Sequence, residues 1–242
     1  MNLSNTKKQI LNCLFPWKCL GCYQYCQNDY PLCPNCFQLL AVKSSFYCPV
    51  CQKRISPNNF SACKTHRYKS PIMAVASPLS YEDNLAKKLI RAFKYQGLIS
   101  LANPFGQILN QVIDEYQEVF QKEQWIIIPI PLHPRKEKQR GFNQAKLLAQ
   151  EISNQFSFLY NDTILTRIKN NPAQAQIDDY EKRKENVKNI FQLQPQCQEQ
   201  IRNQNIILID DVITTGATLG EAAKLLKING AHKIIALCLA KG

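Results

Sequence analysis

Two adjacent carboxylates, Asp210 and Asp211, separate an apolar run from a run of small hydroxyl-bearing residues. The preceding residues, Ile206 to Ile209, predict a short strand that is buried on both faces, as in the middle of a parallel sheet, and that ends at the two acids. Ligands of open parallel sheets lie beyond the carboxyl ends of the strands, so we expect both acids at the lip of a binding crevice.

The residues that follow the acids favour a phosphate. They are small and mostly hydroxyl-bearing: Thr214, Thr215, Gly216, Ala217 and Thr218. The apolar spacing from Leu219 to Leu226 predicts a helix directly behind them, and a helix N-terminus offers unpaired N–H groups and a positive dipole end. Carboxylates accept hydrogen bonds from sugar hydroxyls, so the stretch predicts a ribose-phosphate cradle. The alternative is a structural strand-turn-helix with solvent-facing acids.

Charge and cysteine divide the chain. The sequence has 242 residues and a net charge of +12, and residues 1–70 carry nine lysines and arginines against one acid and nine of the eleven cysteines. This break predicts a cysteine-rich domain over residues 1–70 and a larger domain over residues 71–242. We find no apolar run of about 18 residues and no secretory signal, so we expect a cytoplasmic protein without membrane insertion.

The cysteines have the spacing of metal ligands. Pairs of C-x-x-C knuckles are typical of zinc ribbons, and four protein ligands leave no open position, so we expect one or two structural zinc ions. The candidate ligands form two sets: Cys19, Cys22, Cys33 and Cys36, then Cys48, Cys51, Cys63 and His66. A disulfide framework is the alternative, and Cys13 and Cys26 stay unassigned, so either could replace a named ligand. A basic zinc module suits single-stranded DNA or a protein partner, although a solvated basic surface is the alternative.

Two further basic segments occur in the larger domain. Asp83 or Asn84 can cap a helix that Gly97 ends, and its basic stripe is interpreted as a solvent-facing side rather than an anion site. That stripe consists of Lys87, Arg91 and Lys94. The buried strand Ile126 to Ile130 precedes a predicted loop, Pro131 to Gly141, with four basic residues. The loop faces the same crevice and could bind pyrophosphate or close as a lid, with an ordinary surface loop as the alternative.

Ile206 to Leu219 resembles the phosphoribosyl-pyrophosphate (PRPP) loop of the type I phosphoribosyltransferases: four apolar residues, two acids, then Thr-Thr-Gly-Ala-Thr. Nearly the whole chain resembles the ComF family of competence proteins. Besides the cysteines and this loop, the segments that carry the resemblance are Lys94-Tyr95-x-Gly97, Pro129 to Arg135, Arg140-Gly-Phe-Asn-Gln144, and the segment from Pro172 and Gln174 to Arg183 and Asn186.

The resemblance implies a type I phosphoribosyltransferase fold, an α/β architecture with a twisted, mostly parallel sheet flanked by helices and a small N-terminal zinc-ribbon domain. It also implies that Asp210 and Asp211 hold the ribose hydroxyls and stabilise oxocarbenium-like charge, while Thr214 to Thr218 hold the 5-phosphate. The residues implied to meet the pyrophosphate with Mg²⁺ are Pro131, Leu132, Arg135, Lys136 and Arg140.

Three functions are compatible with these features. The first is a PRPP-dependent transferase with an unknown acceptor, acting in DNA uptake and natural transformation as the resemblance implies. The second is a non-catalytic PRPP or nucleotide sensor whose zinc domain binds single-stranded DNA or a competence partner. The third is a structural adaptor with a relic pocket, which the intact acids and Thr/Gly loop argue against.

Overall fold

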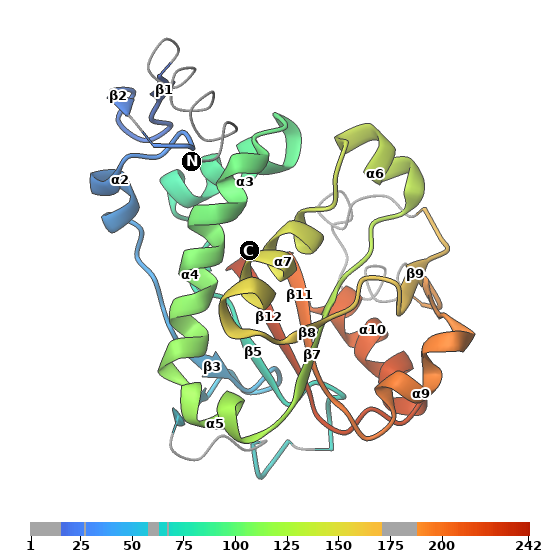
Figure 1. The fold of residues 1–242 in the computed structure, drawn as a ribbon. Helices are drawn as coiled ribbons and strands as arrows, with labels where there is room; N and C mark the ends of the chain where they lie inside the picture. The colour runs from blue at the N-terminus through green and yellow to red at the C-terminus, as the bar shows by residue number, and fades with distance from the viewer. Residues whose placement is uncertain (1–15, 27, 58–62, 67, 171–187) are drawn as a thin grey trace.

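The computed structural model describes residues 16–26, 28–57, 63–66, 68–170 and 188–242, and its centre is an eight-stranded sheet (Figure 1). The strand order is β4-β3-β5-β12-β11-β7-β8, with β6 also pairing with β12. The strands are β3 Phe46–Tyr47, β4 Arg54–Ile55, β5 Ala74–Ala76, β6 Leu79–Ser80, β7 Trp125–Pro129, β8 Leu159–Tyr160, β11 Asn205–Ile213 and β12 Ile234–Lys241. All neighbours from β5 to β8 pair in parallel. The predicted α/β fold with a mostly parallel sheet is therefore confirmed.

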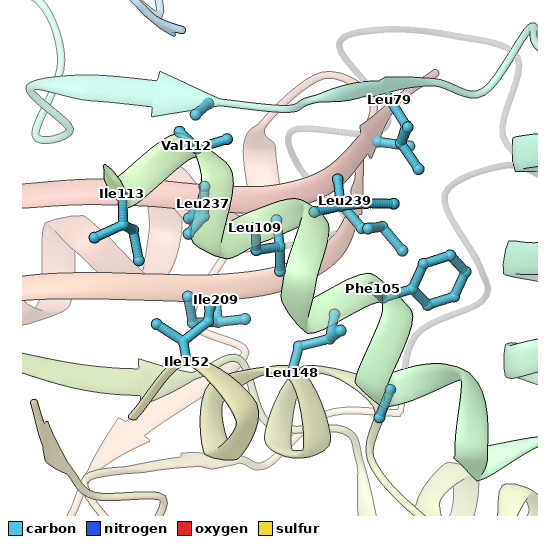
Figure 2. Packing of buried hydrophobic residues seen from close by; sticks show 14 of the residues in the cluster. Leu79, Phe105, Leu109, Val112, Ile113, Leu148, Ile152, Ile209, Leu237 and Leu239 are labelled. Carbon is cyan, nitrogen blue, oxygen red and sulfur yellow. The ribbon is translucent and has the colours of Figure 1, made fainter. Parts of the chain in front are cut away.

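Helices cover both faces of this sheet. The described helices outside the cysteine-rich region are α3 Asn84–Tyr95, α4 Ala102–Glu115, α5 Gln117–Lys122, α6 Pro134–Arg140, α7 Gln144–Phe156, α9 Gln198–Ile201 and α10 Ala217–Ile228, with 3₁₀ turns η2 Ile99–Leu101 and η4 Pro195–Cys197. Of these, α6 buries no residue. On one face α4 and α7 pack their apolar sides against β11 and β12 (Figure 2). On the other face Leu219, Ala222 and Leu226 of α10 pack against Ile206 and Leu208 of β11. Among the described helices, none combines the length and apolar character needed to cross a bilayer.

The central strand is longer than predicted. β11 passes through both acids and ends at Ile213, because Val212 and Ile213 pair with Ala240 and Lys241 of β12. The expectation that the strand stops at the carboxylates was wrong. Pairing with a neighbouring strand of matching length keeps the backbone extended beyond the apolar run that defined the strand in the sequence. The acids consequently have backbone positions fixed by the sheet rather than by a loop.

The cysteine-rich region adjoins the sheet directly. Its small elements are β1 Trp17–Lys18 paired with β2 Tyr25–Cys26, the short helix α2 Pro34–Gln38, and the strands β3 and β4. β3 pairs antiparallel with both β4 and β5, so it extends the main sheet by two strands. Leu32, Leu40 and Phe46 belong to the same buried cluster as α4 and β12. The division of the chain at residue 70 stays a prediction, and the two parts share one continuous core.

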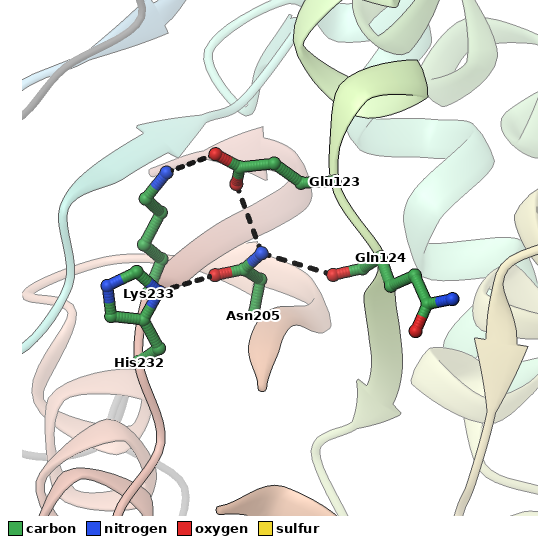
Figure 3. Close-up of polar contacts among 5 residues, drawn as sticks. All are labelled: Glu123, Gln124, Asn205, His232 and Lys233. Atoms are coloured by element: carbon green, nitrogen blue, oxygen red, sulfur yellow. Dashed lines mark hydrogen bonds and ion pairs between the residues drawn. The ribbon is translucent and has the colours of Figure 1, made fainter. Parts of the chain in front are cut away.

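A polar cluster joins the beginnings of three central strands (Figure 3). The buried Asn205 amide donates to Glu123 Oε2 at 3.0 Å and to the Gln124 carbonyl at 3.1 Å. Its Oδ1 lies 3.2 Å from His232 Nδ1, and Lys233 forms an ion pair with Glu123. Every polar atom of the Asn205 side chain therefore has a partner, as burial demands. We call Glu123, Gln124, Asn205, His232 and Lys233 the strand-start cluster.

Candidate functional site

The two acids of β11 lie at the carboxyl end of the sheet and point to opposite faces. Along β11, Ile207 and Ile209 lie in the core under α4 and α7, whereas Ile206 and Leu208 lie in the core under α10. Successive side chains of a strand alternate between faces, so Asp211 points to the first face and Asp210 to the second. At the carboxyl end of β11, one carboxylate therefore lies toward each face of the sheet.

Asp211 is paired with a lysine from α3. Its Oδ1 lies 2.8 Å from Lys94 Nζ, and both side chains are largely buried. Burial lowers the pKa of Lys94, but the Asp211 and Asp210 carboxylates outweigh it, so the pKa lies above its ordinary value. The interpretation of the Lys87, Arg91 and Lys94 stripe as solvent-facing is correct for the exposed Lys87 and Arg91 and wrong for Lys94.

Lys94 reaches the acids because it lies in the last turn of α3. Asp83 caps the start of that helix, because its Oδ1 accepts a hydrogen bond from the Ala86 N–H at 2.7 Å, and the helix ends before Gly97, which has a φ of 68°. Both ends agree with the sequence prediction. The periodicity of the sequence could not reveal that the last turn of α3 lies next to the carboxyl end of β11, where Lys94 contacts Asp211.

Asp210 holds its proton unusually tightly. Burial, followed by repulsion from Asp211, raises the pKa of Asp210 to about 7. The Asp211 N–H, which donates to Asp210 Oδ1 at 2.8 Å, and the charges of Lys94 and Arg167 oppose this rise. A carboxyl that titrates near neutrality and faces nearby cations is an electrostatic arrangement common at functional sites.

The Thr/Gly loop and α10 follow the acids as predicted. Gly216 has a φ of 75°, a left-handed conformation that suits glycine, and α10 begins at the next residue. Thr215 Oγ1 accepts a hydrogen bond from the Ala217 N–H at 3.3 Å, which orders the turn. Thr214 to Thr218 are partly buried and surround the N-terminus of a twelve-residue helix. The backbone there can present N–H groups to an anion.

The basic segment after β7 is a helix rather than the predicted loop. Pro131 and Leu132 connect β7 to α6, and His133 Nδ1 accepts from the Arg135 N–H at 3.2 Å at its start. Pro134 occupies the first helical turn and Gly141, at φ 84°, ends the helix. These are good start and stop signals, which the charge density of the segment obscured.

Of the basic residues of α6, Lys136 and Arg140 are partly buried, whereas Arg135 and Lys138 are exposed. Arg140 donates to Gln144 Oε1 at 3.0 Å, and its guanidinium lies 5.3 Å from the centre of the Tyr95 ring. Burial, then the charges of Arg167 and Arg140, lower the pKa of Lys136. Lys136 therefore lies near both Arg140 and Arg167, and Arg167 in turn interacts with Asp210.

Arg167 is a site residue that the sequence interpretation missed. It ends β9 Leu165–Arg167, which pairs antiparallel with β10 Phe191–Leu193 in a separate two-stranded sheet. Burial lowers the pKa of Arg167 and the Asp210 carboxylate opposes that effect. The available signal was a single arginine within the mostly apolar stretch Ile164 to Ile168. The Pro172 to Asn186 segment, quoted for its resemblance, lies outside the described residues.

The first cysteine set comes together as predicted. The sulfur atoms of Cys19, Cys22, Cys33 and Cys36 all lie within 4.8 Å of one another. Cys19 Sγ accepts N–H groups from Gly21 at 3.4 Å and Cys33 at 3.3 Å. A Cβ at Gly21 would lie 2.6 Å from Cys36 Sγ, so the knuckle needs glycine. Cys26 lies outside the set, with its sulfur 3.5 Å from the Trp17 carbonyl oxygen, and Cys13 lies outside the described residues.

The ligand atoms of the second set also all lie within 4.8 Å of one another; the set consists of Cys48, Cys51, Cys63 and His66. His66 Nδ1 lies 3.6 Å from Cys63 Sγ and 3.8 Å from Cys48 Sγ. A tetrahedral zinc with Zn–S bonds of about 2.3 Å requires sulfurs about 3.8 Å apart. The separations are 3.8 Å for Cys22–Cys33 and 3.9 Å for Cys51–Cys63, far longer than a disulfide bond. The described cysteines are all free thiols, so both sets fit structural zinc.

Comparison with known proteins identifies a domain in the C-terminal part of the chain. Residues 138–242 match the family described as the phosphoribosyl transferase domain. The chain is 33% identical over 147 residues to competence protein F of Haemophilus influenzae, covering 60% of this chain and 63%, less than two thirds, of that protein. The chain is 29% identical over 224 residues to DNA utilization protein YhgH of Escherichia coli O6:H1, and the match covers 92% of this chain and 89% of that protein. It is 26% identical over 211 residues to competence protein ComFC of Bacillus subtilis, and the match covers 84% of this chain and 80% of that protein. The chain is therefore similar to competence protein F, ComFC and YhgH, its residues 138–242 match the phosphoribosyl transferase domain, and its cysteine clusters are consistent with a zinc ribbon.

Proposed function

We propose that this protein binds PRPP at the acid pair, acts in DNA uptake or utilisation, and transfers the phosphoribosyl group to an acceptor that is not identified. The observation that carries the proposal is the charge at the edge of the sheet: Lys94 and Arg167 interact with the two acids, and Lys136 and Arg140 extend the positive charge from Arg167. The N-terminus of α10 follows the acids in the chain. Such a site combines groups for sugar hydroxyls with an excess of positive charge for phosphates.

The residue roles follow from this arrangement. Asp210 and Asp211 accept hydrogen bonds from the ribose hydroxyls, and the backbone of Thr214 to Thr218 binds the 5-phosphate. Lys136 and Arg140, with Pro131, Leu132 and Arg135 near the start of α6, meet the pyrophosphate, and we add Arg167 to this group. Mg²⁺ would arrive with the pyrophosphate and neutralise it, because Asp211 is already paired with Lys94.

Catalysis in this proposal is electrostatic. Breaking the bond between the anomeric carbon and the pyrophosphate oxygen leaves the electron pair on pyrophosphate and positive charge on the ribose. The carboxylate form of Asp210, populated above the raised pKa of about 7, stabilises that charge together with Asp211. The acceptor nucleophile then forms the new bond to the anomeric carbon and loses its proton.

A sensor function is the second candidate, and exposed aromatic residues near the first cysteine set favour it. Tyr23 and Tyr25 are 67% and 66% exposed, and the ammonium groups of Lys88 and Lys18 lie 4.0 and 5.1 Å from their ring centres. Aromatic rings beside cations suit unpaired bases, so this surface is proposed to bind single-stranded DNA. A competence protein is the alternative partner, and we propose that both functions operate in the cytoplasm.

Calorimetric titration with PRPP and Mg²⁺ tests the ligand. We expect Asp211→Asn to weaken binding at least about tenfold, because the neutral amide leaves Lys94 unpaired and changes the contact to the ribose. Asp114→Asn, the same change at an exposed position of α4, is the matched control. Equal affinities of the two variants would refute the ribose-binding role.

Pyrophosphate release separates the transferase from the sensor. The wild-type protein is incubated with PRPP, Mg²⁺ and candidate acceptors that include single-stranded DNA. Acceptor-dependent release supports transfer, whereas PRPP binding without release from any acceptor favours the sensor. For DNA, Tyr23→Ala with Tyr25→Ala should lower affinity and Tyr68→Ala should not, and the affinity should fall with added salt.

Zinc analysis tests the cysteine-rich part. We propose a zinc-binding domain over residues 1–70, followed by the phosphoribosyltransferase-like domain over residues 71–242, and expect two zinc ions per chain from the two ligand sets. Cys22→Ser should lower the content to about one, because it removes a ligand. Cys26→Ser should leave two ions, because its sulfur lies outside the first set.

A further inference from the structure

A cavity separates the phosphate loop from the second cysteine set. It has a volume of about 540 Å³ and lies between Ile213 to Gly216 on one side and Tyr47 to Val50, together with Gln52, on the other. This volume falls within the range of small-molecule sites. Its walls come from segments far apart in the chain, so it exists only because β3 is joined to the main sheet.

The cavity is distinct from the site at the acid pair. Neither Asp210 nor Asp211 lines it, and neither do Lys94 or Arg167. Its floor includes Ile72 and Val75, which belong to the buried cluster on the α10 face of the sheet. Lys94 and Asp211 lie toward the opposite face. The cavity and the acid pair therefore share only the segment from Ile213 to Gly216.

The lining offers two kinds of contact. The aliphatic side chains of Ile72, Val75 and Ile213 form an apolar surface, with Tyr47, the sheet neighbour of Val75, beside them. Lys69 and Lys241 add two positive charges, and Ser77 adds a hydroxyl. Lys241 Nζ donates to Gln52 Oε1 at 3.0 Å, which holds the ammonium group at the cavity. The first turn of α10, with its positive dipole end, is also exposed to it.

We propose that this cavity binds a nucleoside 5′-monophosphate, with the base against Tyr47 and the aliphatic floor and the phosphate between Lys69 and Lys241. A flat, partly apolar ring matches the first surface and a doubly charged phosphate matches the second. The nucleotide is either free or the 5′-terminal nucleotide of a DNA strand, since both present the same base and phosphate. This site adjoins the proposed PRPP site, because Thr214 to Gly216 border both, but its proposed contacts to the base and phosphate do not involve the acid pair.

Gly220 allows the cavity to be filled without disturbing the fold. It lies in α10 and lines the cavity, and a Cβ at this position would have no heavy atom within 4 Å. Gly220→Leu places a large side chain in that space and raises helix propensity. Gly220→Ala raises helix propensity with little filling, and is the matched control.

Calorimetry with the four deoxynucleoside 5′-monophosphates tests the proposal. We expect binding to the wild-type protein and to Gly220→Ala, and at least a tenfold weaker affinity for Gly220→Leu and for the Lys69→Gln, Lys241→Gln double variant. A short oligonucleotide with and without a 5′-phosphate distinguishes the source, because only a strand-end site binds the phosphorylated form more tightly. PRPP is titrated separately into every variant.

Three results would overturn the site. They are the absence of nucleotide binding, unchanged binding in Gly220→Leu, and displacement of the nucleotide by PRPP together with its loss in Asp211→Asn, which would locate it at the acid pair. The PRPP titrations show independently whether the proposed function holds. Nucleotide binding that survives Asp211→Asn but not Gly220→Leu supports the cavity whatever the PRPP result.

Discussion

The polar groups at the start of β11 have all their partners within the protein, whereas those at its end do not balance one another in charge. At its start, the buried Asn205 amide has partners for its donors and its acceptor within the strand-start cluster. At its end, Asp210 and Asp211 interact with Lys94 and Arg167, Lys136 lies near Arg167, and burial raises the pKa of Asp210 to about 7. The first arrangement is complete within the protein, whereas the second has positive charge in excess of its two acids.

This difference suggests distinct roles along a single strand. Satisfied buried polar groups fix the register of neighbouring strands, as the strand-start cluster does for β7, β11 and β12. A site for an anionic ligand instead keeps positive charge that is neutralised only when the ligand binds. Changes at the start should therefore affect stability alone, and changes at the end should affect ligand binding as well.

The largest expected effect comes from leaving Lys94 unpaired. Asp211→Ala should lower the free energy of unfolding by about 3 kcal/mol, because a largely buried lysine loses its ion pair. Combining Asp211→Leu with Lys94→Met should recover most of that loss while PRPP binding stays weak. Urea denaturation measures the first quantity and calorimetry the second. A double variant as unstable as Asp211→Ala would contradict the importance of the unpaired charge.

The acid end of β11 should make the stability of the protein depend on pH. The pKa of Asp210 is raised from 3.8 to about 7, so between these values the folded protein holds a proton that the unfolded chain has lost. This contribution to stability is present below about pH 4 and is lost as the pH rises through about 7. The loss should be about 2 kcal/mol, roughly half of what the full shift represents, because water reaches the half-buried carboxyl.

Asp210→Asn removes this titration. The loss of unfolding free energy between pH 4 and pH 8 should be smaller in the variant than in the wild-type protein, as measured by urea denaturation at both pH values. Asp114→Asn on the exposed side of α4 serves as the control and should follow the wild-type curve. Identical pH profiles for all three proteins would show that Asp210 has an ordinary pKa.

At the start of the strand, Asn205→Ala should lower the free energy of unfolding by about 2 kcal/mol, because the Gln124 carbonyl and Glu123 lose their donor in a buried place. PRPP affinity should stay unchanged. Asn154→Ala, on the exposed side of α7, should leave both quantities nearly unchanged. A loss of PRPP affinity in Asn205→Ala would break the division between the two ends.

The smallest expected effect is at Arg167. Arg167→Met keeps much of the side-chain volume and removes the charge near Asp210, so PRPP affinity should fall about tenfold with little change in thermal stability. Arg202→Met, at an exposed position paired with Glu199, is the control. Equal PRPP affinities for the two variants would remove Arg167 from the pyrophosphate group.

Local sequence patterns correctly predicted those elements whose structure depends mainly on residues adjacent in the sequence. The apolar run before Asp210 predicted a central strand, and the residues from Leu219 predicted α10 immediately after the Thr/Gly loop. The cysteine spacing predicted two compact sets of four ligands. Each of these depends on backbone geometry over a few residues, which residue type and period specify.

The helix α6 and the length of β11 show where local signals were insufficient. The basic residues from Arg135 to Arg140 concealed the start and stop signals of α6, and pairing with β12 extended β11 past its apolar run. Charge density and hydrophobic period describe a segment on its own. Hydrogen bonding to a neighbouring strand adds information that the segment does not contain.

The sequence by itself thus determined the acid pair, the phosphate loop and the ligand sets, because each lies within a short continuous stretch. Tertiary structure alone decided that Lys94 pairs with Asp211, that Arg167 approaches Asp210, and that β3 brings the second cysteine set to the edge of a cavity. The physical reason is that these contacts join segments far apart in the chain. Only the packing of helices and strands around one core determines which of those segments meet.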